Sequence, residues 1–501
     1  MPIFGKIRLY GGNDYLTCAL KTDETMERIQ RLLPTAFYLS PTLMKRVFVV
    51  FIALVLTSCA STPTAMQHEE DQPQNVVFFI SDGCGPASFG LAREYQRSMD
   101  GIPNLQLDPY EQGSTITFAE GSRVTDSAAS ATAYACAIKT LNGRIAMTAD
   151  RQSVETILEK AEKAGYNTGV ISTARVTHAT PAAFSSHVES RNMEAEIAEQ
   201  QITKGMEIVM GGGTQFYTPT EQGGARTDGR NLIAEAQDLG YHRVDDRSQL
   251  LNADALPLIG LFTRSHMAYE IDRDRDAEPS LAEMTTKALE LLSADGKPFF
   301  IMIEAGRIDH AGHGNDPAAH LWDVMAYDAA WKAAVDFAAV DGKTLVLGTS
   351  DHETGGLTLG AEYGGNGGSG YAYDPTKLAA VSSSIEAFGN RARAAFADGS
   401  LDADWIRQHL ESSFNVDVSV HADRINGILA VADTNAALAM SGMQRFLVAV
   451  TSDSARVGWS TGGHTAVNVP IFGYGPGAEH FTGTLDNTEI GARLQEALGL
   501  K

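Results

Sequence analysis

Cysteine and basic residues are scarce in this chain, and each shortage excludes a class of protein. The 501 residues include only four cysteines, and no two of them form a Cys-x-x-Cys pair. A thiol-based redox or metal motif and a disulfide framework are therefore not expected. Lysine and arginine total 39 against 62 aspartate and glutamate residues, a formal net charge of −23. Because nucleic-acid binding needs a positive surface, nucleic acid is not an expected partner.

The N-terminal part also lacks an apolar run long enough to span a bilayer. The apolar residues 47–56 are too few for a membrane-spanning helix, which takes about 20. They follow Met-Lys-Arg at 44–46, and this order of charged and then apolar residues is typical of an export signal. The sequence LTSC at 56–59 resembles a bacterial lipobox. We therefore expect residues 44–58 to be a lipoprotein signal peptide and Cys59 to be lipidated.

These signals predict where the protein lies in the cell and how the chain is divided. Ala60 follows the lipobox cysteine, a pattern similar to that of proteins sorted to the outer membrane. We expect an exported, periplasmic protein with a lipid anchor in the outer membrane. Residues 1–43 precede the signal and are expected to lie outside the fold, and the polar residues 59–74 are expected to be a flexible tether. The folded domain is predicted from 75 to 501.

Buried-strand patterns alternate with helical patterns along this domain. Continuous β-branched and aromatic runs favour parallel strands buried on both faces, at residues 75–80, 168–172, 207–210, 299–303, 344–348, 446–451 and 469–474, of which 469–474 is expected to be the last. Helices are predicted at residues 154–164, 281–293 and 321–340. Between these elements, residues 360–442 change to Gly-rich and then Ala-rich sequence and predict an inserted subdomain.

The stretch RVTDSAASATAYACAIKTLNG at 123–143 places a hydroxyl at the start of a predicted helix. Asp126 is a favourable N-cap residue, and the small residues behind it have high helix propensity. Ser127 is therefore expected in the first turn, where unpaired N–H groups and the helix dipole favour an anion. A serine alkoxide or an incoming phosphate would be stabilised there.

Hard metal ligands follow several predicted strands. Asp82 follows the first strand, and Asp351 and His352 follow the strand at 344–348, at the carboxyl ends where α/β sheets place their ligands. The block EAGRIDHAGH at 304–313 contains Asp309 and His313 four residues apart, a spacing that suits zinc, and Glu304 for a harder ion. His464 lies on a Gly-rich loop.

The loop after the strand at 168–172 supplies polar groups of another kind. Arg191 offers a planar fork that matches two phosphate oxygens. Thr180 precedes Pro181, and the proline clash is expected to hold Thr180 extended and so to fix the direction of its hydroxyl. His178 lies two residues before Thr180.

Four of these motifs, TDSAASATA, EAGRIDHAGHG, SDHETGG and STGGHT, occur in an order that resembles the alkaline phosphatase family. The resemblance runs from about residue 75 to the end and is weakest between 360 and 442. It implies a three-layer α/β/α sandwich with a mainly parallel central sheet. It also implies a metal-dependent hydrolase of phosphate monoesters, with two Zn²⁺ and one Mg²⁺ per chain, and homodimers are common in the family.

The resemblance assigns roles residue by residue. Ser127 would be the nucleophile that forms a phosphoserine, and Arg191 the phosphate clamp. The implied ligands are Asp309, His313 and His464 for one zinc, Asp82, Asp351 and His352 for the second, and Asp82, Thr180 and Glu304 for magnesium. His178 and His310 stand where the best-known bacterial members have Asp and Lys. This pair is similar to that of animal and some marine bacterial enzymes.

Two other functions fit parts of the pattern, a phosphodiesterase and a binding protein, whereas a sulfatase does not. A phosphodiesterase of the same superfamily would share the metal ligands, although such enzymes usually present a threonine nucleophile. A sulfatase needs Cys or Ser in a CxPxR-type context, which neither Cys84 nor Cys136 has. From a different class, a lipid-anchored binding protein could keep the fold without the chemistry. Such a loss usually shows as missing ligands, whereas all six zinc ligands, Ser127 and Arg191 are present.

Overall fold

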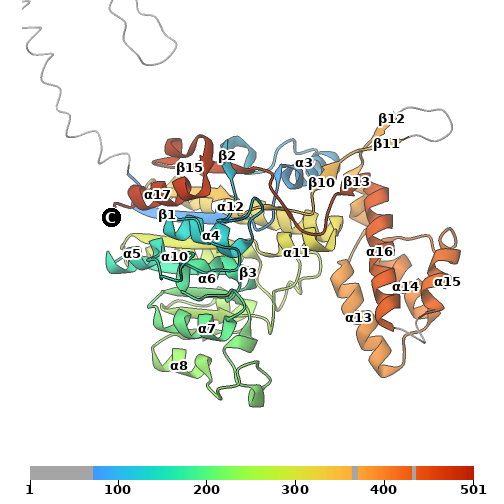
Figure 1. Cartoon of the computed structure of the whole chain (residues 1–501), viewed down its shortest axis with the longest axis horizontal. Helices are drawn as coiled ribbons and strands as arrows, with labels where there is room; N and C mark the ends of the chain where they lie inside the picture. The colour runs from blue at the N-terminus through green and yellow to red at the C-terminus, as the bar shows by residue number, and fades with distance from the viewer. Residues whose placement is uncertain (1–71, 364–369, 432–435, 501) are drawn as a thin grey trace, which may run out of the picture. The chain divides into compact units, whose positions relative to one another are not determined.

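The computed structural model describes residues 72–363, 370–431 and 436–500 (Figure 1). The predictions for residues 1–43, for the export signal at 44–58 and for Cys59 lie outside the described residues, as does most of the tether predicted at 59–74. Within these ranges, no helix combines the length and the apolar character needed to cross a membrane.

A ten-stranded sheet forms the centre of the described residues. Its order is β16-β2-β15-β8-β1-β7-β3-β4-β6-β5. The strands are β1 (Asn75–Ile80), β2 (Glu111–Ile116), β3 (Asn167–Arg175), β4 (Ile208–Gly212), β5 (His242–Val244), β6 (Leu258–Leu261), β7 (Phe299–Glu304), β8 (Thr344–Thr349), β15 (Val469–Tyr474) and β16 (Gly483–Asp486). Only β15 runs antiparallel to its neighbours, β2 and β8. The predicted mainly parallel sheet is confirmed.

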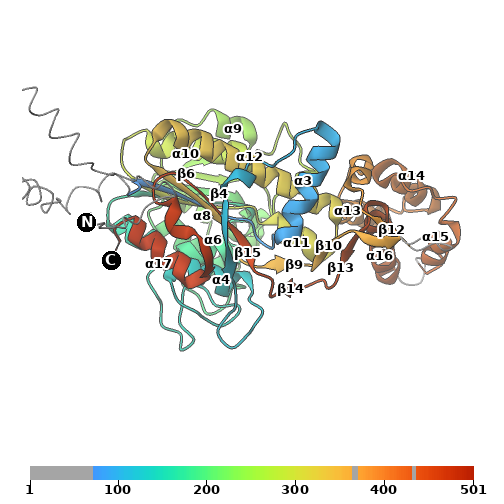
Figure 2. The same cartoon turned by 90° about the horizontal axis from the view of Figure 1, so that it is seen from above.

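Helices cover both faces of this sheet (Figure 2). One face carries α3 (Pro86–Asp100), α9 (Arg247–Leu251), α10 (Leu281–Ser293) and α12 (Pro317–Asp341). The other carries α4 (Ser127–Cys136), α5 (Ile157–Lys163), α6 (Ala179–Ser185), α7 (Glu194–Thr203), α8 (Leu232–Asp238) and α17 (Asn487–Ala497). In β1, Val77 and Phe79 pack into the first layer and Phe78 into the second. Burial of alternate side chains on both faces explains why this strand is apolar throughout.

A group of helices lies beyond the sheet and contains most of the predicted insert (Figure 1). It comprises α13 (Ile385–Asp398), α14 (Ala403–Phe414), α15 (Ala422–Leu429) and α16 (Ala436–Ala455). Three short strand pairs precede or follow these helices in the chain: β9 (Glu353–Thr354) with β14 (His464–Thr465), β10 (Leu357–Leu359) with β13 (Val457–Trp459), and β11 (Ala361–Tyr363) with β12 (Gly370–Ala372).

Two of the predicted strand assignments are wrong. Residues 446–451 are helical, because they form part of α16. The buried side chains Met443, Phe446 and Leu447 follow a spacing of three and four residues, which favours a helix. A short apolar run does not by itself distinguish a buried strand from a buried helix. The strand at 469–474 is not the last, since β16 follows it and pairs with β2 at the edge of the sheet.

The expectation that Thr180 is extended is also wrong. Thr180 lies in the first turn of α6, and the N–H of Ala182 donates to the carbonyl of His178 over 3.0 Å. Pro181 is tolerated there because the first N–H groups of a helix have no partner within it, so the missing donor costs nothing. The steric clash between a proline and the preceding residue disfavours a helical backbone but does not forbid it, and Thr180 is helical in α6.

Candidate active site

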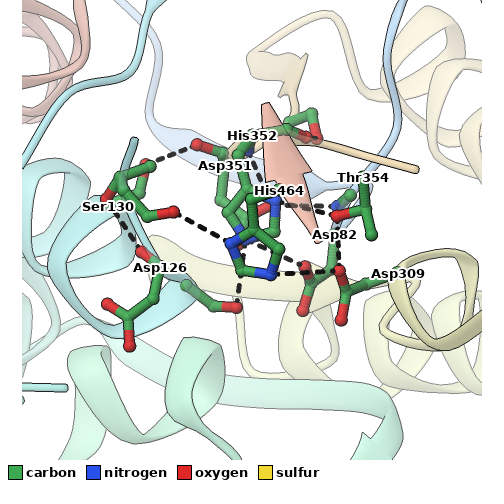
Figure 3. A network of polar contacts seen from close by, with 12 residues as sticks. Asp82, Asp126, Ser130, Asp309, Asp351, His352, Thr354 and His464 are labelled. Carbon is green, nitrogen blue, oxygen red and sulfur yellow. Dashed lines mark hydrogen bonds and ion pairs between the residues drawn. The ribbon is translucent and has the colours of Figure 1, made fainter. Parts of the chain in front are cut away.

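Ser127 is the first residue of α4 and is almost fully buried. The Asp126 carboxylate caps the helix by accepting from the N–H of Ala129 over 3.0 Å. All ten residues of α4 are buried, which small side chains allow because neighbouring backbones can then approach closely. The Ser127 Oγ lies 3.3 Å from Nε2 of His352. Figure 3 shows His352 close to Asp351 and His464. Helix α4 therefore places the Ser127 hydroxyl at the carboxyl end of β8, which His352 follows.

A first group of metal-binding side chains contains Asp309, His313 and His464. Asp309 and His313 stand one turn apart on α11 (Arg307–Gly314), and His464 comes from β14. Nε2 of His313 lies 3.4 Å from Asp309 Oδ2, and Nε2 of His464 lies 3.6 Å from Asp309 Oδ1. The three ligand atoms therefore surround a single point, at which one metal ion would contact all of them.

Hydrogen bonds fix the tautomers of these two histidines. Nδ1 of His313 lies 2.7 Å from the carbonyl oxygen of Gly462, and Nδ1 of His464 lies 2.9 Å from that of Thr125. A carbonyl oxygen only accepts, so each Nδ1 carries the proton and each Nε2 presents a lone pair. The two Nε2 atoms are 3.1 Å apart. Two nitrogens on one tetrahedral zinc are separated by about 3.3 Å, so a zinc ion fits between them.

A second group contains Asp82, Asp351 and His352, all fully buried. Asp82 follows β1, and the other two follow β8, the neighbouring strand. Nε2 of His352 lies 3.2 Å from Asp351 Oδ2 and 3.7 Å from Asp82 Oδ1. The N–H of Gly83, a residue with φ of 75°, donates to Asp351 Oδ1 over 3.1 Å. This bond turns the other Asp351 oxygen toward Asp82.

A third group contains Asp82, His178 and Glu304. Ser172 donates to one Glu304 oxygen. Several buried ligand atoms of the second and third groups have no hydrogen-bond partner among the described residues: both oxygens of Asp82, Asp351 Oδ2, Glu304 Oε1, Thr180 Oγ1 and His178 Nδ1. Buried carboxylate oxygens without partners are costly unless a cation satisfies them. The residues present therefore fit divalent metals.

Burial and mutual repulsion shift the pKa values of these carboxyl groups. Burial, followed by the charges of Asp351, Asp309 and Glu304, raises the pKa of Asp82 well above its usual range. Burial also raises the pKa of Asp351, and raises that of Glu304 to about 7. A bound cation would lower the pKa values of these carboxyl groups again. The three carboxylates therefore suit a positive charge that the protein itself does not supply.

Arg191 lies beside the start of α4. Its NH1 donates to Asp126 Oδ2 over 3.0 Å, and its NH2 lies 3.0 Å from Nε2 of His178. Its backbone N–H donates to the carbonyl of Gly143 over 2.7 Å. The guanidinium is therefore held by side chains on two different segments, one of which, Asp126, directly precedes Ser127.

The structure also brings in two residues that the motifs did not single out. Thr354 Oγ1 donates to Asp309 Oδ1 over 2.6 Å and lies 3.2 Å from Nδ1 of His352, so it connects the first two groups. The ring of His266 lies 4.3 Å from that of His310 and 5.5 Å from that of His178, measured between centroids. Thr354 lies inside SDHETGG, whereas no sequence signal points to His266.

In protein stripped of metal by a chelator, Glu304→Gln is expected to raise the melting temperature, and increasingly so as pH rises. The pKa of Glu304 is raised from 4.5 to about 7, so the folded state keeps a proton that the unfolded state releases. Stability from this proton is fully present below about pH 4.5 and is lost as pH rises through about 7. Thermal unfolding of both proteins from about pH 5 to about pH 8 measures the difference. A gain in melting temperature that does not change with pH would contradict a raised pKa of Glu304.

The ranking of the two proteins should reverse once metal is restored. With zinc and magnesium present, the ionised Glu304 gains a cation partner that glutamine cannot replace with equal strength. The wild type is then expected to melt higher than Glu304→Gln at about pH 8, a reversal that a purely steric effect of the substitution would not produce.

Metal-dependent hydrolases are the class that this fold and this site define. The carboxyl ends of a parallel sheet carry adjoining groups of hard ligands, and a helix presents a serine to them.

The family model for alkaline phosphatase matches residues 73–500, and the chain belongs to the alkaline phosphatase family, whose activity is the hydrolysis of phosphate monoesters. The chain is 36% identical to the repressible alkaline phosphatase of Saccharomyces cerevisiae, over 92% of this chain and 88% of that protein.

Solved structures are similar over most of the described chain. The alkaline phosphatase of Thermus thermophilus superposes with a TM-score of 0.75 at 30% identity, covering 88% of this chain and 96% of that one. A mutant of the TAB5 alkaline phosphatase, from an Antarctic bacterium, is described with Mg bound in its M3 site. It has a TM-score of 0.62 and 26% identity, and the match covers 86% of this chain and 99% of that one.

Proposed function

We propose that this protein hydrolyses phosphate monoesters through a phosphoserine intermediate on Ser127, with two zinc ions and one magnesium ion. The observation that carries the proposal is the 3.3 Å separation between Ser127 Oγ and Nε2 of His352, which belongs to the second metal-binding group. A hydroxyl this close to a metal-binding nitrogen lies within reach of a cation held there.

The donor chemistry of each group assigns its metal. Asp309, His313 and His464 would hold one zinc, and Asp82, Asp351 and His352 the second, because zinc prefers imidazole and carboxylate ligands. Asp82, Thr180 and Glu304 would hold magnesium, whose ligands are oxygen atoms. His178 belongs to the same group as Asp82 and Glu304. The TAB5 structure with Mg bound in its M3 site supports a third metal in the family. Bound zinc would supply Lewis-acid stabilisation of the oxygens that gain charge during the displacement.

The chain's own residues then perform the remaining steps. Ser127 Oγ attacks phosphorus, and its bond to phosphorus forms as the bond to the ester oxygen breaks. The proton of the Ser127 hydroxyl passes to water, and the leaving ester oxygen takes a proton from water. The N–H groups at the start of α4 face the incoming negative charge. Arg191 holds equatorial phosphate oxygens, and Asp126 keeps its guanidinium in place. In a second displacement water attacks the phosphoserine, the bond between phosphorus and Ser127 Oγ breaks, and inorganic phosphate is released. A proton from the attacking water returns to Oγ and regenerates Ser127.

The proposal extends to the location and assembly of the protein. Residues 44–58 would direct export to the periplasm, and Cys59 would carry a lipid that anchors the domain in the outer membrane through the tether at 59–74. A homodimer is proposed on the resemblance to the family alone.

A comparison of three substrates tests the reaction class. The purified domain, beginning after Cys59 and loaded with zinc and magnesium, is expected to hydrolyse p-nitrophenyl phosphate in preference to bis-p-nitrophenyl phosphate and p-nitrophenyl sulfate. Preference for the diester would favour the phosphodiesterase function. Metal analysis of the same sample gives the zinc and magnesium stoichiometry, and protein that binds no zinc and gains no activity on its addition would indicate a binding protein.

A further inference from the structure

A groove of about 460 Å³ lies between the ligand-bearing helix α11 and the helices of the insert. From the core it is lined by Tyr269, His310 and His313, and from α13 and α16 by Glu386, Gln444 and Arg445. Figure 2 shows α11 and α13 side by side. Because His313 belongs to the first metal-binding group and is partly exposed, the groove runs from the metal site to the surface of the insert.

The wall formed by the insert is attached to the core by an ion pair and a buried hydrogen bond. The guanidinium of Arg307, which is 3% exposed, forms an ion pair with Glu386 at 2.7 Å. Asp316 Oδ2 accepts from the N–H of Ile385 over 2.7 Å, while its other oxygen caps α12. Arg307 lies on the same helix as Asp309 and His313. The insert is therefore attached directly to the helix that carries two metal ligands.

The charges along the groove are unequal. The Glu386 carboxylate is neutralised by Arg307, whereas Arg445 only donates to the Ser441 hydroxyl, over 2.5 Å. No carboxylate among the described residues lies within ion-pair distance of Arg445. In a protein with a net charge of −23, this exposed guanidinium is a local positive charge on the groove that His313 also lines.

The reaction geometry determines which part of a substrate enters the groove. In an in-line displacement the leaving oxygen stands opposite the attacking Ser127 Oγ, which lies beside His352 of the second group. The leaving group is therefore directed toward the first group, and so toward His313 and the groove. This step rests on the function proposed above.

We propose that the groove is a leaving-group subsite in which Arg445 selects phosphate monoesters whose leaving group carries a second anion, such as a carboxylate. Tyr269 and the apolar side chains Ile385 and Val448 form the sides along which the body of the leaving group lies. Arg445 offers two N–H donors in the plane that a carboxylate matches. The insert thus contributes to substrate choice although none of its described residues belongs to a metal-binding group.

Two substrates of nearly equal shape test the proposal. Phenyl phosphate and 4-carboxyphenyl phosphate differ in one anionic group on the leaving side. Arg445→Ala is expected to lower kcat/KM for the carboxylated substrate about fivefold relative to phenyl phosphate. In the wild type, high salt is expected to remove the preference for the carboxylated substrate over phenyl phosphate. Arg393→Ala is the matched control, because Arg393 is also an exposed arginine of the insert but does not line the groove.

The outcomes separate this inference from the function on which it rests. An unchanged ratio of the two kcat/KM values in Arg445→Ala would overturn the subsite, as would an equal change of the ratio in Arg393→Ala. Failure of the metal-loaded wild type to hydrolyse phenyl phosphate would overturn the proposed function and the subsite together. Folding of both variants is checked by their zinc content and melting temperature, which are expected to match the wild type.

Discussion

Replacing Ser127 by alanine is expected to lower turnover of p-nitrophenyl phosphate by about 10³-fold or more, because no other described hydroxyl lies within hydrogen-bond distance of His352 Nε2. The variant should form no covalent phosphoenzyme on brief exposure to labelled substrate. Its zinc content should stay near that of the wild type, since every side chain of the three metal-binding groups is still present in the variant. Acid quenching, which traps phosphoserine, measures the first result, and metal analysis measures the second.

Ser130→Ala is the matched control for this experiment. Ser130 stands one turn further along α4 and donates to the Asp351 carbonyl over 2.7 Å, so it is equally buried but offers no oxygen to the metal-binding side chains. This variant is expected to lose some stability and to keep phosphoenzyme formation. If Ser127→Ala turned over substrate at the wild-type rate, the assignment of the nucleophile would be refuted.

Replacing His464 by alanine is expected to remove the zinc of the first group and to lower activity by about 100-fold or more. His464 is the only ligand of that group outside α11, and its Nε2 lies 3.1 Å from that of His313. Two ligands on one helix turn cannot complete a tetrahedral site. Zinc stoichiometry after dialysis, measured beside kcat/KM, gives both effects, and added zinc should restore part of the activity.

The surface residue His480 provides the control for this loss. It lies on the segment between β15 and β16, is largely exposed, and belongs to none of the metal-binding groups. His480→Ala should keep the full zinc content and normal kinetics. A His464→Ala protein that retains wild-type zinc and turnover would show that the imidazole is not a ligand.

Much of the fold was predictable because its signals are local. Continuous apolar runs indicated β1, β7 and β8, since a strand buried on both faces needs apolar side chains at every position. Asp126 and the small residues behind it predicted the start of α4 at Ser127, because capping depends on neighbouring residues only. The strand predicted at 446–451 failed where helix and strand have the same apolar pattern and tertiary packing chose α16.

The sequence by itself determined the ligand types, their order along the chain and their positions at strand ends, because these depend on residue identity and on local pattern. Only the tertiary structure decided which ligands meet. Asp82 and Asp351 are 269 positions apart and come together because β1 and β8 are paired neighbours. Thr354 connects His352 to Asp309, and Arg445 reaches the groove, only through packing between distant segments. Contacts of this kind depend on the order of strands and the docking of helices, which no local pattern encodes.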